Sequence, residues 1–300
     1  MMKISVVIVT FNRLELLKEC LGNVFNQSKQ FNEIIVVNNA STDGTEVYLE
    51  TIKDELTVID LEDNLGGSGG FYYGLKKSVE NENDWTLLID DDAMISTNYN
   101  EIISKCISNE KIAENVSGFS GTVVCNGNVD FGHRSYAKSN KSFTVSHSTQ
   151  ADYIQNYFDY DFTTFCGVYI SSKAVKKIGY PIKEYFIWHD DSEYSIRLRT
   201  QGIIRNINEA KLNHKTLINS SQVKVSWKNY YGMRNSIDIR KKYYGVFDNL
   251  KTILKIRMAI VYRTVFKNKN KQDKYIIQLY KDALRDGRKN NLGKNPNYLP

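Results

Sequence analysis

The chain has 300 residues, 41% of them hydrophobic and 25% charged, which is ordinary for a globular protein with one large domain and an appendage. Its four cysteines are widely spaced and form no paired motif, which disfavours a disulfide framework or a cysteine zinc site and fits a reducing cytoplasm. The net charge of +6 is uneven, since residues 251–300 hold 13 Lys and Arg against 3 Asp and Glu, so a near-neutral body with a basic tail is expected.

The first third of the chain predicts strands that alternate with helices. Buried strands are expected at residues 4–9, 34–37 and 56–61, and apolar residues at helical spacing mark helices at 14–25 and 45–52. This order with short connections predicts a right-handed, mostly parallel sheet in an α/β fold. The strand pattern at the start indicates no signal peptide, and no apolar run approaches the ~20 residues of a transmembrane helix.

A glycine-rich run follows the third strand, with four glycines among residues 66–70. Such a run lets a ligand approach the main chain closely, and the free N–H groups of a helix expected at 72–79 would face an anion. A flexible surface loop is the alternative. The place of the run between a strand and a helix, shortly before an acidic triplet, favours the phosphate-binding interpretation.

The acidic triplet Asp90, Asp91 and Asp92 comes directly after the apolar residues 87–89. Three adjacent carboxylates repel one another and are costly to desolvate. A hard divalent cation offsets that cost, because Mg²⁺ and Mn²⁺ prefer oxygen ligands and also bind substrate phosphates. A solvated acidic turn is the alternative. The position of the triplet at the carboxyl end of a strand favours the interpretation as a metal–phosphate site.

The middle of the chain is less informative. A strand is expected at residues 118–124, and the polar segment 127–150 predicts a hairpin or an acceptor-side flap. His133 and His147 within it are interpreted as solvated rather than catalytic. Residues 162–171 predict one central strand.

A second acidic pair, Asp190 and Asp191, follows aromatic residues and begins a predicted helix. Carboxylates are favoured at a helix N-terminus, so an ordinary cap is one interpretation. The other is a division of labour, in which the first cluster holds a metal and a leaving diphosphate while the second supplies a general base to an acceptor hydroxyl. The residues alone leave both open.

The basic tail contains a segment, residues 250–267, in which aliphatic and aromatic residues interleave with lysines and arginines. A basic amphipathic helix of this kind lies in an anionic membrane interface. Packing on the domain or on a second copy is the alternative, which leaves a homo-oligomer open.

Four motifs in this order resemble the nucleotide-binding half of family 2 inverting glycosyltransferases. They are Thr-Phe-Asn-Arg at 10–13, the turn at 37–45, the glycine run and the aspartate triplet. The glycine run with the triplet most resembles the bacterial galactofuranosyltransferase branch, and rhamnosyltransferases are close neighbours. The resemblance implies a GT-A type nucleotide-diphospho-sugar transferase domain over residues 1–245, with a mostly parallel central sheet flanked by helices, and a basic helical extension over 246–300.

The resemblance also implies roles for the acidic residues. Asp191 matches the base that deprotonates the acceptor, and Asp190 the neighbour that holds acceptor hydroxyls. Asp92 and His214 match ligands of Mn²⁺ or Mg²⁺, with Asp90 near the ribose or a metal-bound water.

Further residues are implied on the two sides of the reaction. The donor-binding residues are Thr10, Phe11, Arg13, Asn38, Asn64, Gly66, Gly67, Gly69, Asp90 and Asp91. The acceptor-binding residues are Trp188, His189 and Glu193, although a core role for Trp188 is equally open. Lys228 or Arg234 would reach a pyrophosphate. The family commonly has aspartate where this chain has Asn38, an amide that donates as well as accepts, so the base contact stays open.

The expected protein is therefore a metal-dependent inverting hexosyltransferase at the cytoplasmic face of the cell membrane. It would move galactofuranose from UDP-galactofuranose to a lipid-linked bacterial surface glycan. One rival is a transferase that uses dTDP-rhamnose or another nucleotide sugar. Another is a non-catalytic module that binds a nucleotide sugar or nucleic acid; carboxylates in both clusters argue against it, so no nucleic-acid partner is expected.

Overall fold

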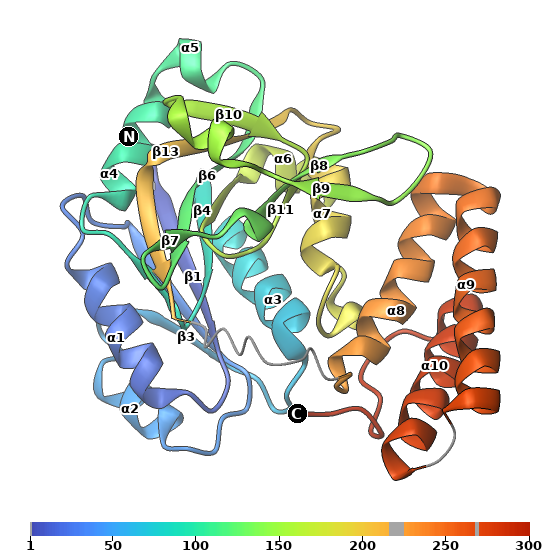
Figure 1. Ribbon diagram of the computed structural model, residues 1–300. Coiled ribbons are helices and arrows are strands. Elements are labelled where there is room, and N and C mark those ends of the chain that lie inside the picture. The colour runs from blue at the N-terminus through green and yellow to red at the C-terminus, as the bar shows by residue number, and fades with distance from the viewer. Residues whose placement is uncertain (1, 216–224, 268–269) are drawn as a thin grey trace.

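The computed structural model describes residues 2–215, 225–267 and 270–300. A ten-stranded sheet forms the centre, with strand order β10-β13-β6-β12-β4-β1-β2-β3, β5 paired to β13 and β7 paired to β6 (Figure 1). Its strands are β1 (Ile4–Thr10), β2 (Glu33–Asn38), β3 (Thr57–Asp60), β4 (Trp85–Asp90), β5 (Ala93–Ile95), β6 (Val116–Cys125), β7 (Asn128–Val129), β10 (Tyr157–Tyr160), β12 (Val168–Ser171) and β13 (Ile203–His214). A small second sheet contains β8 (Arg134–Ala137), β9 (Val145–His147) and β11 (Phe162–Thr163).

Helices cover both faces of the sheet and form the C-terminal part of the molecule (Figure 1). They are α1 (Leu14–Phe25), α2 (Thr45–Thr51), α3 (Gly66–Glu80), α4 (Tyr99–Ser108), α5 (Glu110–Ala113), α6 (Ser172–Ile178), α7 (Asp190–Leu198), α8 (Lys228–Ile239), α9 (Gly245–Phe266) and α10 (Lys271–Lys289). Short helical turns lie at Phe131–His133, Gln150–Ile154, Lys183–Tyr185 and Arg240–Tyr244.

The first half of the sheet is parallel, as predicted. β1 lies between β2 and β4, with Val7 beside Ile35 on one side and Leu88 on the other. Successive β1 side chains point to opposite faces, so Val6 belongs to the core that contains α1, whereas Val7 belongs to the core that contains α3. A strand covered on both faces needs a continuous apolar run, which is why the sequence pattern identified it.

The second half of the sheet is mixed, because β12 runs antiparallel to both β4 and β6 while β13 is parallel to β6. The single strand predicted over residues 162–171 is wrong. Its beginning pairs with β8 as β11, and its end enters the main sheet as β12. Gly167 separates them at φ +80°, and a Cβ there would lie 2.1 Å from the side chain of Leu212.

The glycine-rich run forms the first turn of α3, which begins at Gly66 rather than at residue 72. Its glycines bring the helix close to β1. A Cβ on Gly70 would lie 2.4 Å from Val9, and one on Gly74 would lie 2.2 Å from Val7. The run is therefore a buried helix start and not a flexible surface loop.

The three C-terminal helices pack together beside the sheet domain (Figure 1). Beyond α10 the chain returns to the sheet domain, where Lys294 forms an ion pair with Asp63 at 2.6 Å. Tyr298 is buried there and its ring stacks on Tyr230 of α8 at 4.4 Å. Among the described residues, every helix is too short or too polar to cross a bilayer.

Candidate active site

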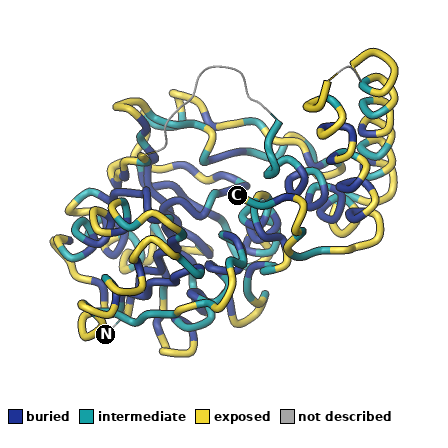
Figure 2. Tube along the Cα trace, turned by 90° about the horizontal axis from the view of Figure 1, so that it is seen from below, coloured by how far each residue is buried: buried dark blue, intermediate teal, exposed yellow. Residues whose placement is uncertain are grey.

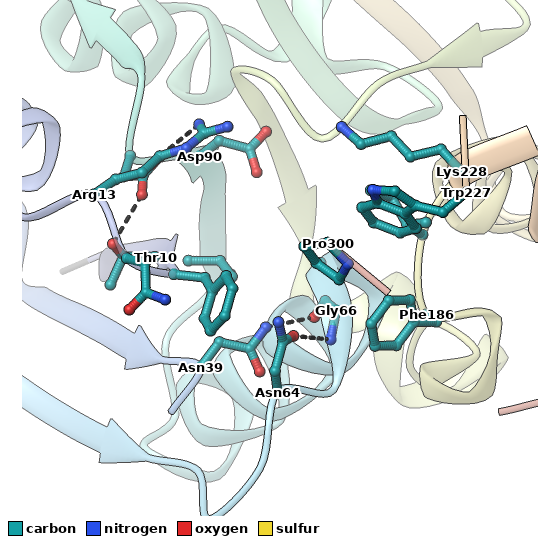
Figure 3. Close-up of a pocket in the computed structure, with 16 residues that line it drawn as sticks. Thr10, Arg13, Asn39, Asn64, Gly66, Asp90, Phe186, Trp227, Lys228 and Pro300 are labelled. Carbon is teal, nitrogen blue, oxygen red and sulfur yellow. Dashed lines mark hydrogen bonds and ion pairs between the residues drawn. The ribbon is translucent and has the colours of Figure 1, made fainter. Parts of the chain in front are cut away.

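A cavity of about 530 Å³ opens at the carboxyl ends of β1 and β4 and at the start of α3 (Figure 3). Eight of the residues implied as donor-binding line it: Thr10, Phe11, Arg13, Asn64, Gly66, Gly67, Asp90 and Asp91. Open α/β sheets bind ligands beyond the carboxyl ends of their strands. Three motifs that are far apart in the sequence thus share one cavity.

Arg13 neutralises part of the first acidic cluster. Its guanidinium lies 3.2 Å from Asp91 and 2.8 Å from Asp92, and the Thr10 hydroxyl also donates to Asp91 at 2.8 Å. Burial, with repulsion from the other two carboxylates, raises the pKa of Asp90 to about 7. Burial raises the pKa of Asp91 to about 6, against the opposing effect of Arg13. The triplet therefore retains unfavourable negative charge, which a cation would relieve.

The arrangement of Asp92 and His214 fits a divalent cation. His214 ends β13, and its Nε2 lies 3.2 Å from the buried Oδ1 of Asp92. Two ligands at right angles on an octahedral ion, each at ~2.1 Å, are about 3.0 Å apart. Burial alone would raise the pKa of Asp92. Hydrogen bonding and charge from His214 instead hold this pKa below its usual value, which keeps the carboxylate ionised.

Two residues, His133 and Cys166, lie beside His214 although the sequence analysis did not place them in this site. His133, Cys166 and His214 bring ligand atoms within 4.8 Å of one another. The expectation that His133 is solvated is wrong, since its side chain is only 13% exposed, and Nδ1 lies 2.7 Å from the Thr164 hydroxyl. The signal was hidden because these residues come from segments that meet only in the folded chain.

Asn38 and Gly69 do not line the cavity. The Asn38 amide donates to Asp60 at 2.8 Å and so joins the ends of β2 and β3. Gly69 packs inside α3, where a Cβ would meet Leu65 at 2.4 Å. The neighbouring Asn39, which sequence analysis missed, lines the cavity instead. Adjacent side chains leaving a strand end point in opposite directions, so a shift of one position changes which residue faces a ligand.

The opposite wall consists of Phe186, Ile187, Trp227, Lys228 and Pro300. Figure 3 shows the Lys228 side chain extending across the cavity toward Arg13 and Asp90.

Arg234 does not reach the cavity. It is buried, and its guanidinium donates to the carbonyl oxygens of Glu184, Tyr185 and Gly293 at 2.6–3.0 Å. Of the two cations considered for a pyrophosphate, Lys228 alone faces this space.

The second acidic pair begins α7, three residues after Ile187 of the cavity wall. Burial, reinforced by the charge of Asp191, raises the pKa of Asp190 to about 8. Asp190 also lies beside Ser68 in the first turn of α3. Burial raises the pKa of Asp191 to about 6, against hydrogen bonds from the amide and hydroxyl of Ser192 at 2.5 and 3.1 Å. Burial therefore favours one proton held by the pair near neutral pH, with Asp190 the more strongly raised of the two.

A strained segment leads into this pair. Phe186, Trp188 and His189 all have positive φ, between +63° and +67°, a conformation that is costly for non-glycine residues. Helix α8 holds residues 184–189 in place. Asn235 donates to the carbonyl oxygens of Tyr185, Ile187 and Trp188 at 2.8–3.1 Å. Arg234 donates to those of Glu184 and Tyr185 at 3.0 Å. The Arg-Asn pair of α8 therefore positions the acidic pair.

The residues implied as acceptor-binding occupy different environments. Trp188 is 42% exposed and lies against Gly232 of α8, where a Cβ would be 2.5 Å from the indole. Burial lowers the pKa of His189 to about 4, so its ring is neutral.

Glu193 is unsuited to the acceptor-binding role. It is 1% exposed, and its carboxylate accepts hydrogen bonds from Arg197 at 2.7 and 2.9 Å and from the Tyr243 hydroxyl at 2.5 Å. Its geometry assigns it to holding α7 rather than to binding an acceptor.

A sequence model of the family described as glycosyl transferase family 2 matches residues 5–161, slightly more than half of the chain. The chain belongs to glycosyltransferase family 2. The matched segment contains the turn after β1, the start of α3 and the aspartate triplet, whereas Asp190 and Asp191 lie beyond it. The finer likeness to the rhamnosyltransferases is not established by this match.

Two curated relatives match part of this glycosyltransferase. The uncharacterized glycosyltransferase YwdF of Bacillus subtilis is 36% identical over 104 residues, 35% of this chain and 38% of the relative. The galactofuranosyltransferase GlfT1 of Mycolicibacterium smegmatis is 30% identical over 112 residues, 37% of each chain. The chain thus spans little more than a third of the length of these relatives.

Solved structures confirm the predicted GT-A type fold. S. aureus TarS residues 1–349 with UDP superpose with a TM-score of 0.56 at 17% identity, over 90% of this chain and 74% of the TarS chain. TarS 1–349 with UDP-GlcNAc gives a TM-score of 0.57 at 16% identity, over 95% and 80%. At such identities the likeness concerns the fold alone.

Proposed function

We propose that this family 2 protein is an inverting glycosyltransferase that moves galactofuranose from UDP-galactofuranose to a bacterial surface glycan. One observation carries the proposal: a single cavity joins the turn after β1, the first turn of α3 and the aspartate triplet, and its far wall leads directly into Asp190 and Asp191. The UDP or UDP-GlcNAc bound in the TarS structures supports a uridine donor. Partial similarity to a galactofuranosyltransferase supports the choice of sugar.

A divalent cation, Mn²⁺ or Mg²⁺, belongs to this proposal, and family 2 enzymes commonly use one. Asp92 and His214 would hold it, and Asp90 lies beside them in the triplet. When bound, the cation supplies positive charge to the leaving diphosphate. The chain adds its own positive charge from Arg13 and Lys228 and from the N-terminus of α3, all at the same cavity.

The transfer would be a single displacement. The ionised Asp191 takes the proton of the acceptor hydroxyl. The acceptor oxygen then bonds to the anomeric carbon as the bond from that carbon to UDP breaks. Asp190, protonated at neutral pH, donates a hydrogen bond to an acceptor hydroxyl and leaves the negative charge on its neighbour. A general base with a pKa near 6 is ionised at neutral pH yet basic enough to accept a proton.

A panel of nucleotide sugars tests the donor. Purified protein with Mn²⁺ is given UDP-galactofuranose, UDP-galactopyranose, UDP-GlcNAc or dTDP-rhamnose, and release of the nucleoside diphosphate is measured with and without a galactan oligosaccharide. Acceptor-dependent turnover of UDP-galactofuranose is expected. Turnover of dTDP-rhamnose alone would establish the rhamnosyltransferase alternative, and binding without turnover of any donor would favour the non-catalytic module.

The site of action is part of the proposal. We propose that the enzyme works in the cytoplasm at the inner face of the cell membrane on a lipid-linked acceptor. The basic extension over residues 246–300 supports this location.

A further inference from the structure

Helix α9 lies on the outer side of the C-terminal helices, and much of it is exposed (Figures 1 and 2). Nine of its side chains are each more than half exposed: Val246, Phe247, Leu250, Leu254, Met258, Val261, Tyr262, Val265 and Phe266. Isolated apolar residues on a surface are ordinary, but several that gather on one face of a helix form a patch of the kind that binds a partner.

Six of these nine residues fall on one face of the helix. At ~100° per residue, the side chains at 247, 250, 254, 258, 261 and 265 lie within an arc of about 80°. The opposite face is already used, because Ile253, Ile256 and Ile260 pack with Ile237 of α8 and Leu284 of α10. The outer apolar face, which we call the α9 stripe, is therefore not required to hold the helix on the domain.

Cations flank the α9 stripe on both sides. On the same helical projection, Lys251 and Lys255 fall on one flank and Arg257 on the other. The acidic residue of the helix, Asp248, is buried and turned inward, where it pairs with Arg240 at 3.0 Å. The outer face thus combines apolar and positively charged groups without a carboxylate.

We infer that the α9 stripe docks this enzyme on an anionic membrane, with α9 lying in the plane of the interface. An apolar stripe bordered by lysine and arginine buries its side chains among acyl chains while the cations meet acidic headgroups. A second copy is a poorer partner, because a face-to-face pair would place Lys251, Lys255 and Arg257 against the same cations. Docking itself is independent of the proposed function. Only its role, which is to bring the enzyme to a lipid-linked acceptor, rests on that function.

Vesicle flotation of the full chain tests this surface without any substrate. The protein is mixed at low salt with vesicles of phosphatidylcholine alone, or with vesicles that also contain roughly 30% phosphatidylglycerol. The anionic phosphatidylglycerol gives the vesicle a negative surface potential, which attracts basic segments. We expect flotation with the acidic vesicles only, and at least about a tenfold loss of binding in Leu254→Ser/Val261→Ser. Lys251→Glu/Lys255→Glu should also lose binding, whereas Val47→Ser, which changes a still more exposed valine on α2, should not.

Two further measurements make the result decisive. Circular dichroism and turnover of a water-soluble acceptor should be unchanged in the stripe variants, so a loss of flotation reports the surface and not unfolding. Absence of flotation of the wild type with acidic vesicles would overturn the inference while leaving the donor assay to stand by itself. A self-association that the stripe variants abolish, without vesicle binding, would assign the stripe to a second copy instead.

Discussion

The two acidic clusters are built in opposite ways. Asp90 to Asp92 stand at the end of a regular strand, and Asp91 and Asp92 lie 2.8–3.2 Å from Arg13 or His214. Asp190 and Asp191 follow a segment with three left-handed non-glycine residues. Burial is the main cause of the raised pKa values in both clusters, but the charge of Arg13 opposes it at Asp90 and Asp91, whereas hydrogen bonds from Ser192 oppose it at Asp191. The first arrangement suits a site that holds charge, and the second suits a site that accepts a proton.

The supports of the clusters differ as well. The triplet is placed by a strand register that the apolar pattern of β1 and β4 dictates. The pair is placed by Asn235 and Arg234, which come from a helix that begins almost forty residues later. The proton-accepting cluster should therefore be sensitive to changes far from it, and the charge-holding cluster only to changes in its direct partners.

The largest expected effect is that of Asp191→Asn. Removing the proposed base should lower the transfer rate roughly 10²- to 10⁴-fold, because an amide cannot accept the proton. Binding of UDP, measured by calorimetry with Mn²⁺, should be unchanged, since the triplet stays intact. Asp54→Asn, an exposed carboxylate near α2, is the matched control. A transfer rate within twofold of wild type would assign the base elsewhere.

His214→Ala should act on the other cluster. We expect Mn²⁺ affinity to fall by at least about tenfold, the loss that removal of even an outer partner of a metal site produces. Free Mn²⁺ is measured by electron paramagnetic resonance during titration, with His147→Ala, an exposed histidine of β9, as control. Equal Mn²⁺ affinity in the two variants would exclude His214 as a ligand.

Asn235→Ala should weaken the pair without touching it. Three carbonyl oxygens lose a donor, so the free energy of unfolding should fall by about 1–3 kcal/mol. Because the strained segment loses its clamp, kcat should fall while the Kd for UDP stays constant. Asn109→Ala, which removes the cap of α5, should cost ~1 kcal/mol with normal kcat. Parallel losses in both variants would reduce Asn235 to a purely structural role.

The last expected effect concerns Asp190 and pH. Its folded-state pKa is raised by burial to about 8, so the folded chain keeps a proton that the unfolded chain releases above pH ~4. The unfolding free energy of the wild type should therefore decline as pH rises from about 4 to 8, by up to about 1 kcal/mol per pH unit. Asp190→Asn should make this slope shallower, because the raised pKa values of Asp90, Asp91 and Asp191 also contribute to it, and Asp54→Asn should leave it unchanged in urea titrations. Identical slopes in all three proteins would contradict the assigned pKa.

Local patterns were enough to predict much of this protein. The apolar runs of β1, β2 and β4 reflect burial on both faces of a parallel sheet, and that burial can be seen in the sequence itself. The sequence also revealed the aspartate triplet at a strand end and the acidic pair at a helix start. Each lies at a boundary between an apolar and a polar segment.

Other features were decided only by tertiary structure. That Asn39 rather than Asn38 faces the cavity depends on the end of β2, and that Gly66 starts a helix depends on how closely α3 lies on β1. The wall of Trp227 and Lys228 comes from a segment more than a hundred residues away from the triplet. The physical reason is that these positions are set by contacts between distant segments, and a contact between distant segments leaves no periodic pattern in either of them.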